Sequence, residues 1–243
     1  MPQPIQTAYH LVDASNWASV QNHGLMSARR LMELCGPVEF SASRHHRSAS
    51  LLLPSGVLIR DQRPMPPTAL MRCLRSGLMP ADWFELLNSK VFFWLEPNRL
   101  NRQRLACGGS PQVALVVNAA VLLTKYGGVA TVTPINTGNA LRSAALRNLT
   151  TFVPYHRWLV DAWAYEEVPG ARHRPRTHPP TELTISEAVP DILNYVMAAV
   201  PLNGGEILDP ETLRRSAHRQ KKSEPAGRFN QRQAKLRNRL QRW

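Results

Sequence analysis

Polar side chains of the kinds used in catalysis and anion binding stand at the borders of expected strands. A histidine can orient a hydroxyl group, a guanidinium can hold a phosphate through two hydrogen bonds, and a glutamate can accept a proton or stabilise positive charge. Each also has an ordinary structural explanation, as a core polar group or a surface ion pair. The residues singled out are His10, Arg60, Arg63, Arg99, His156 and Glu182.

Two arginines flank an acid where an expected hairpin ends. Two short apolar runs, 51–53 and 57–59, surround a Pro-Ser-Gly turn, and Arg60, Asp61 and Arg63 follow them. A guanidinium at this place can clamp a pyrophosphate or stabilise a departing charge. A surface ion pair with Asp61 is the simpler alternative. Of the two arginines we favour Arg63 for the functional role.

An aromatic run, Val91–Leu95, predicts the central strand of a sheet. It contains Phe93 and Trp94, whose rings can stack on a flat ligand or simply fill the core. Arg99 follows the run in a basic stretch, where we expect it to have a polar role. His156 lies in a polar cluster further along the chain.

The order of expected elements favours an α+β fold, because strands alternate with irregular loops and not with a regular series of helices. Neither G-x-G-x-x-G nor a P-loop is present, so the common nucleotide fingerprints are absent. We expect strands at 9–12, 91–95, 113–117, 129–132 and 182–185, and helices at 27–34, 68–74, 80–87, 119–126 and 189–199.

Composition narrows the class of protein. The first residues lack a basic segment followed by an apolar one, and the longest apolar stretch, 113–123, is about half of the roughly 20 residues that a membrane span needs. Three cysteines without C-x-x-C spacing favour reduced thiols over disulfides or a zinc site. We therefore expect a cytoplasmic protein that uses no metal and does not enter a membrane.

The positive charge is concentrated at the C-terminus. The net charge is +13, and residues 214–242 contain eleven Lys and Arg against one acid, Glu224. We expect one folded domain, 1–212, and a basic, flexible tail, 213–243, that can bind phosphates without help from the domain. A solubilising role for the tail is the alternative.

Several of these strings together resemble DarT-type ADP-ribosyltransferases. The string around His10 is followed by Gly24-Leu25, as in the entry motif of that superfamily, and the aromatic strand is followed by Pro97 and Arg99. The strongest likeness is Glu182, which opens a late strand before the Val189-Pro190 turn, where the family has its catalytic glutamate. The resemblance implies a split mixed β-sheet surrounded by helices.

The same resemblance implies NAD as a substrate and gives each residue a role. His10 would orient the ribose, Arg63 or Arg60 would bind phosphate, and Phe93 or Trp94 would flank the nicotinamide. Glu182 would hold the ribose 2′-hydroxyl and support an oxocarbenium-like transition state. Arg99 and His156 would complete the cofactor-binding set. Glu187 and the pair Glu166-Glu167 are rivals to Glu182.

The strings IRDQRPM and LLNSKVFFWL are also similar to an uncharacterised bacterial family. The basic, proline-rich segment 169–180 departs from the DarT pattern in the place where those enzymes recognise their acceptor, so the acceptor can differ. DNA or RNA is the favoured acceptor, and an antitoxin protein is a further partner that the resemblance raises. The alternatives are a non-catalytic nucleic-acid-binding protein and, ranked lower, a tRNA 2′-phosphotransferase.

Overall fold

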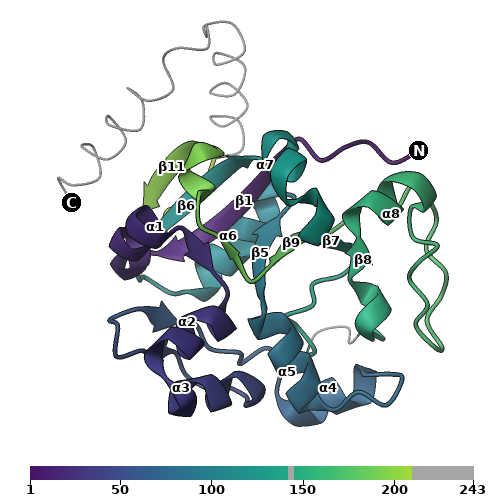
Figure 1. Ribbon diagram of the computed structural model, residues 1–243, viewed down its shortest axis with the longest axis horizontal. Coiled ribbons are helices and arrows are strands. Elements are labelled where there is room, and N and C mark those ends of the chain that lie inside the picture. The colour runs from purple at the N-terminus through teal and green to yellow at the C-terminus, as the bar shows by residue number, and fades with distance from the viewer. Residues whose placement is uncertain (142–144, 210–243) are drawn as a thin grey trace, which may run out of the picture.

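A computed structural model describes residues 1–141 and 145–209, which form one large sheet with helices on both faces and at one end (Figure 1). The strands are β1 (Thr7–Asp13), β2 (Leu25–Met26), β3 (Leu51–Leu52), β4 (Leu58–Ile59), β5 (Lys90–Trp94), β6 (Gln112–Asn118), β7 (Ala130–Thr133), β8 (Val153–Pro154), β9 (Glu182–Ser186), β10 (Ala188–Val189) and β11 (Val196–Leu202). The helices are α1 (Trp17–His23), α2 (Ala28–Cys35), α3 (Pro37–Ser41), α4 (Pro67–Cys73), α5 (Pro80–Asn88), α6 (Pro97–Ala106), α7 (Ala119–Tyr126) and α8 (Tyr155–Asp161).

The large sheet has the strand order β11-β6-β1-β5-β9-β7-β8 and is divided in its middle. Strands β1 and β6 pair along the whole of β1, whereas β1 and β5 pair only at Tyr9 and Trp94. The expected α+β class and the division of the sheet are therefore found. The expected mixture of parallel and antiparallel strands is wrong, because every ladder of this sheet is antiparallel among the described residues.

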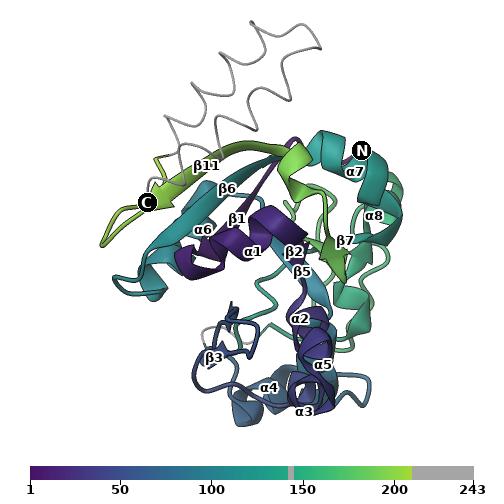
Figure 2. The same ribbon diagram turned by 60° about the vertical axis from the view of Figure 1, so that its left-hand side comes forward.

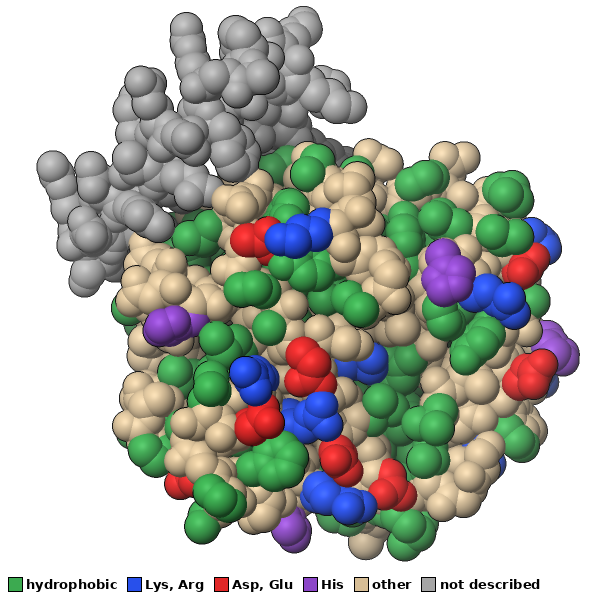
Figure 3. All heavy atoms as spheres, viewed as in Figure 1, with side chains coloured by type: hydrophobic (Ala, Val, Ile, Leu, Met, Phe, Trp, Pro, Cys, Tyr) green, Lys and Arg blue, Asp and Glu red, His purple; other side chains and the backbone are tan. Residues whose placement is uncertain are grey.

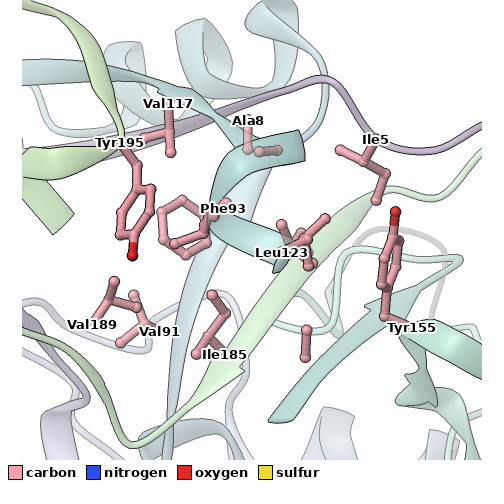
Figure 4. Close-up of a cluster of buried hydrophobic side chains, with 14 of the residues drawn as sticks. Ile5, Ala8, Val91, Phe93, Val117, Leu123, Tyr155, Ile185, Val189 and Tyr195 are labelled. Atoms are coloured by element: carbon pink, nitrogen blue, oxygen red, sulfur yellow. The ribbon is translucent and has the colours of Figure 1, made fainter. Parts of the chain in front are cut away.

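One face of the sheet carries the main core, because side chains alternate between the two faces along each strand. Phe93, Leu115 and Leu183 come from three strands of this core face, and each is at most 1% exposed. Helices α1, α7 and α8 cover it, with Val20, Leu122 and Trp158 among the contacts. Figure 4 shows part of this cluster, with Phe93 between residues of neighbouring strands.

The opposite face, called here the second face, carries a row of residues that are register partners. Tyr9 of β1 lies opposite Trp94 of β5, Trp94 lies opposite Glu182 of β9, and Glu182 lies opposite Thr133 of β7. Directly opposed residues of antiparallel strands project to the same side. The row thus brings an aromatic strand, a carboxyl and a hydroxyl to one face of the sheet, across its division.

Helices α2 to α5 gather at one end of the sheet, below it in Figures 1 and 2. Helices α4 and α5 pack through a second hydrophobic cluster that includes Leu70, Trp83 and Phe84. The short hairpin of β3 and β4 packs on Met32 of α2. This end of the molecule carries the arginines that follow β4.

Helices α2, α4, α5 and α7 begin and end within one residue of their expected bounds, and strand β5 lies fourth of seven in the sheet. The expected hairpin is also confirmed, with Leu51 opposite Ile59. Apolar periodicity predicts these elements well because each one buries a single face. The proposed tail, 213–243, lies outside the described residues.

The expected helix 189–199 is wrong. The chain instead forms β10, a single 3-10 turn at Ile192–Asn194, and the edge strand β11, which pairs with β6. A short apolar run such as Val196–Val200 fits a strand or a helix equally well, so its pairing with β6 decides. Pro201 fits this place, because an edge strand tolerates a residue without an N–H group.

Candidate functional site

Glu182, the first residue of β9, is enclosed by hydroxyl groups. Its side chain is buried, with 3% of the residue exposed. Oε2 lies 2.8 Å from Thr133 Oγ1 and 2.8 Å from Thr137 Oγ1, and the Thr137 backbone N–H donates to the two carboxyl oxygens at 3.2 and 3.3 Å. These hydrogen bonds satisfy the buried carboxyl and fix its orientation.

The hydrogen atoms available around Glu182 favour its protonated form. Thr133 Oγ1 lies 2.8 Å from the Ile135 carbonyl, which can only accept, and 2.8 Å from Glu182 Oε2. A hydroxyl has one hydrogen, so both contacts are hydrogen bonds only if Glu182 donates to Thr133. Burial raises the pKa of Glu182 to about 7, although the hydrogen bonds from Thr137 and the charge of Arg147 oppose that rise.

Arg147 fixes the segment that covers Glu182. Its guanidinium donates to the carbonyls of Thr137 and Asn139, each at 2.9 Å, and lies over the Trp83 ring at 5.8 Å. Arg147 is 1% exposed. The charge of Arg147 lowers the pKa of Glu182 through space and so favours the ionised carboxylate.

His10 closes the division of the sheet from the core face. Its Nδ1 lies 2.6 Å from the Phe92 carbonyl oxygen, and its ring lies 5.5 Å from the ring of Phe93. Burial lowers the pKa of His10, and the bond to Phe92 opposes that change. Since a carbonyl only accepts, Nδ1 carries the hydrogen of the neutral ring and Nε2 is left as an acceptor.

The two aromatic candidates of β5 differ in access. Phe93 is 1% exposed in the core, so its ring is closed to a ligand, and we remove it from the candidate site. Trp94 lies on the second face between Tyr9 and Glu182, is half-buried, and donates from Nε1 to Gln103 Oε1 at 2.6 Å. Alternation along the strand explains the difference, because neighbouring residues face opposite ways.

The arginines after β4 surround a single acid. Arg63 is exposed and pairs with Asp61 at 3.1 Å, so the simple ion pair considered for it is present. Arg60 is half-buried, and its Nη1 is buried without a hydrogen-bond partner in the described part of the chain. Burial is the largest single influence on the pKa of Asp61 and raises it. The hydrogen bonds and charge of Arg63, together with the charge of Arg60, outweigh burial and lower this pKa overall.

Two other candidates lie apart from Glu182. Arg99 on α6 is half-buried and pairs with Glu96 at 3.6 Å. His156 is exposed on α8, which packs on the core face, whereas the Glu182 carboxyl projects from the second face. The structure therefore brings Glu182 and Trp94 together on the second face. It places His10 on the core face, on the strand across the division of the sheet, and it separates His156 from all three.

The rival glutamates have other partners. Glu187 forms an ion pair with Arg29 and has a positive φ of 63°. Glu166 is buried and pairs with Arg174 at 2.6 Å, and Glu167 is exposed. Of these four glutamates, Glu182 alone lies in the row of register partners on the second face.

Sequence reasoning missed four residues of this region: Thr133, Thr137, Arg147 and Arg47. Threonines in strands and turns carry no distinctive signal, and Arg147 comes from a stretch without periodicity. Arg47 was within reach, because it ends the string Arg44-His45-His46-Arg47 in an expected loop, where clustered basic residues lack a core role.

Basic and acidic side chains are interleaved on the face of the molecule shown in Figure 3, so that face has no broad area of one sign. Within residues 1–141 and 145–209, no helix has both the length and the apolar character needed to cross a membrane. The same residues hold no group of three His, Cys, Asp or Glu side chains arranged for a metal ion.

Residues 6–196 match the model of a family of unknown function, DUF7002, and the chain belongs to that family. No curated protein is similar enough to count as a match. Two solved structures of DarT from Thermus sp. 2.9 are similar to it at 13% identity and a TM-score of 0.36. One is in complex with ADP-ribosylated ssDNA and covers 93% of this chain and 95% of its own, and the other is in complex with NAD+ and covers 92% and 93%. At this TM-score the overlap is too loose to assign a function.

Proposed function

We propose that this protein cleaves NAD at the bond between nicotinamide and ribose and transfers ADP-ribose to a macromolecular acceptor, with nucleic acid favoured. The observation that carries the proposal is the Glu182 carboxyl. It is buried, bonded to two threonines and placed beside Trp94 at the division of the sheet. It also stands where the sequence resemblance places a catalytic glutamate.

The state of Glu182 suits the positively charged nicotinamide ring of NAD. With a pKa raised to about 7 by burial, the carboxyl is close to half-ionised at neutral pH. The nicotinamide ring of NAD is cationic, and a nearby positive charge favours the carboxylate. Binding would thus release the proton of Glu182, and the carboxylate would stabilise the charge that develops on the ribose as nicotinamide leaves.

In this proposal the other residues bind and orient the substrate. Trp94 stacks on the nicotinamide from the second face. His10 presents Nε2, its free acceptor, to a ribose hydroxyl, while Nδ1 keeps its bond to Phe92. Arg60 is the better phosphate ligand of the two arginines considered, because Arg63 is already paired with Asp61 and Arg60 Nη1 is not paired. Arg99 keeps a secondary place at the substrate's edge, whereas His156, exposed on α8 and separated from the other candidates, has no role in this proposal.

Nicotinamide release by the purified full chain tests the proposal. NAD is incubated with the protein alone and with single-stranded DNA, RNA or cell lysate, and free nicotinamide and transferred label are measured. Glu182→Gln should abolish release without loss of folding, because the amide has the same shape, can hydrogen-bond to both threonines and carries no charge. Glu187→Gln, a change of the same kind five residues along the chain, should keep activity. Release by Glu182→Gln at the wild-type rate would refute the proposal.

The pH dependence of release gives a second readout. Only the ionised form of Glu182 can stabilise a positive charge, so the rate should rise with pH through about 7. A rate that is flat between about pH 5.5 and 8.5, or that falls over this range, would contradict the role of this carboxyl.

The eleven Lys and Arg of residues 214–242 favour one other function, non-catalytic nucleic-acid binding. Deletion of residues 214–243 separates the two functions. An enzyme of the proposed kind should keep nicotinamide release after the deletion, whereas a protein that only binds nucleic acid should lose its function and should never release nicotinamide.

A further inference from the structure

Arg47 is held by a buried polar network that leaves part of its guanidinium free. Nε donates to the Arg60 carbonyl at 3.1 Å and Nη2 donates to Asn88 Oδ1 at 2.9 Å. Gln62 joins the network, since its Oε1 accepts from the Arg47 backbone N–H at 3.2 Å. Arg47 Nη1 is buried and has no partner among the described residues.

Arg60, which accepts a hydrogen bond from Arg47, also has an unpaired guanidinium nitrogen. Its Nη1 is likewise buried and without a hydrogen-bond partner in the described part of the chain. Buried polar groups in folded proteins nearly always have partners, so two such nitrogens on neighbouring arginines indicate a missing acceptor. The burial of Arg47 lowers its pKa to about 10, opposed by the charge of Asp61, which still leaves it charged at neutral pH.

The acid in this cluster does not fill the two vacant positions. Both carboxyl oxygens of Asp61 are engaged by Arg63, through its backbone N–H and its Nη2, each at 3.1 Å. Three guanidinium groups therefore surround one carboxylate, which leaves two positive charges. A pyrophosphate diester carries two negative charges and offers oxygen acceptors along its length, whereas a single carboxylate ligand would leave one charge uncompensated.

The cluster lies on the side of the molecule that contains Trp94. Cys107, at the end of α6, is close enough to Arg60 and Asp61 for their charges to act on its thiol pKa, which burial raises. The Cys107 thiol also contacts the carbonyl of Gln103, whose side chain accepts the hydrogen bond from Trp94. A ligand that stacks on Trp94 would thus have its phosphates on the same side of the molecule as these arginines.

We propose that Arg47 and Arg60 form a binding site for a pyrophosphate ester, with Arg47 as its anchored member. Arg47 is fixed by Asn88 and by the Arg60 carbonyl, so its free Nη1 is preorganised, and Arg60 supplies the second fork. The identity of the ester as NAD rests on the proposed function. The binding of a pyrophosphate does not rest on the proposed function, because binding requires no covalent bond to be broken.

The test is equilibrium binding of ADP-ribose, ADP and adenosine to the full chain, followed by calorimetry or by tryptophan fluorescence. ADP-ribose and ADP should bind and adenosine should bind far more weakly. Arg47→Gln and Arg60→Gln should each weaken ADP-ribose binding about 10- to 100-fold, the usual effect of losing a charge-assisted hydrogen bond. Arg44→Gln is the matched control, because Arg44 lies three residues before Arg47 but pairs at the surface with Asp82 and Glu85, and its loss should leave the affinity unchanged.

Arg60→Gln keeps the test decisive if Arg47→Gln does not fold, because Arg60 Nη1 has no hydrogen bond to lose. The inference is overturned if folded variants bind ADP-ribose as the wild type does, if adenosine binds as tightly as ADP, or if the variants weaken only single-stranded oligonucleotide binding. Parallel nicotinamide assays separate the two proposals. If ADP-ribose binding depends on Arg47 but no nicotinamide is released, the binding site stands and the proposed reaction is refuted. If nicotinamide is released but ADP-ribose binding does not depend on Arg47, the reaction stands and the binding site is refuted.

Discussion

Replacing Glu182 by glutamine should remove one pH dependence from the folding stability of this protein. The amide has the same shape as the protonated carboxyl. Its nitrogen, in the place of Oε2, can donate to the hydroxyls of Thr133 and Thr137, and its oxygen, in the place of Oε1, can accept from the Thr137 backbone N–H at 3.3 Å. What the variant lacks is the ability to ionise.

The size of the effect follows from the two pKa values. The pKa is 4.5 for an unperturbed glutamate and about 7 for Glu182 in the folded chain, where burial is the main cause. Between these values the folded chain keeps the proton that the unfolded chain has lost, so the free energy of unfolding falls as pH rises. The contribution is complete below pH 4.5, is lost as pH rises through about 7, and amounts to about 3 kcal/mol.

The assay is urea denaturation of the wild type and Glu182→Gln at matched pH values from about 4 to 8.5. The difference between the two unfolding free energies cancels the titration of the other groups. It should change by about 3 kcal/mol in favour of the variant as pH rises, equivalent to roughly 6–12 °C in Tm. A difference that is constant with pH, or that changes in favour of the wild type, would refute the assignment of a protonated carboxyl to Glu182.

Two further substitutions test the parts of the fold that support this site. Gly24→Ala should destabilise the chain by more than about 2 kcal/mol in urea denaturation, because φ is +75° and the new Cβ would lie 2.4 Å from the Pro190 oxygen. Gly77→Ala, with a similar φ of +74° but nothing within 4 Å, should lose only about 1 kcal/mol, and equal losses would disprove the role of Pro190. Arg147→Met should lose about 3 kcal/mol, since it leaves the Thr137 carbonyl without its donor at 2.9 Å. The same variant should move the pH profile of nicotinamide release to higher pH, because the Arg147 charge lowers the pKa of Glu182.

The sequence predicts elements that bury a single apolar face. Strand β5 and helix α7 are examples, because their apolar residues recur with one clear period or form one compact run. It fails at Val196–Val200, where a short run fits two structures and pairing with β6 decides between them. It also cannot show that the sheet is antiparallel throughout, since strand direction depends on long-range connections.

The candidate site is predictable only in part. Glu182 could be found because the turn that follows it resembles a known motif. Which face each β5 ring occupies could not be found, because the alternation that buries Phe93 and leaves Trp94 half-buried needs the register of the sheet. Arg47 could be noticed from its basic string, but its binding role could not. Its importance comes from an absent partner, which only a three-dimensional structure reveals.

The single pairing of Tyr9 with Trp94 has a consequence for how the protein opens. Ladders of four to seven register pairs join β11, β6 and β1, and also β5, β9 and β7, with β8 paired to β7 at two positions. The two groups are joined within the sheet by one residue pair and the His10 bond to Phe92. Amide hydrogen exchange should therefore divide into two sets of protected positions, each with its own opening free energy. A molecule built in this way can loosen along one line without melting either half.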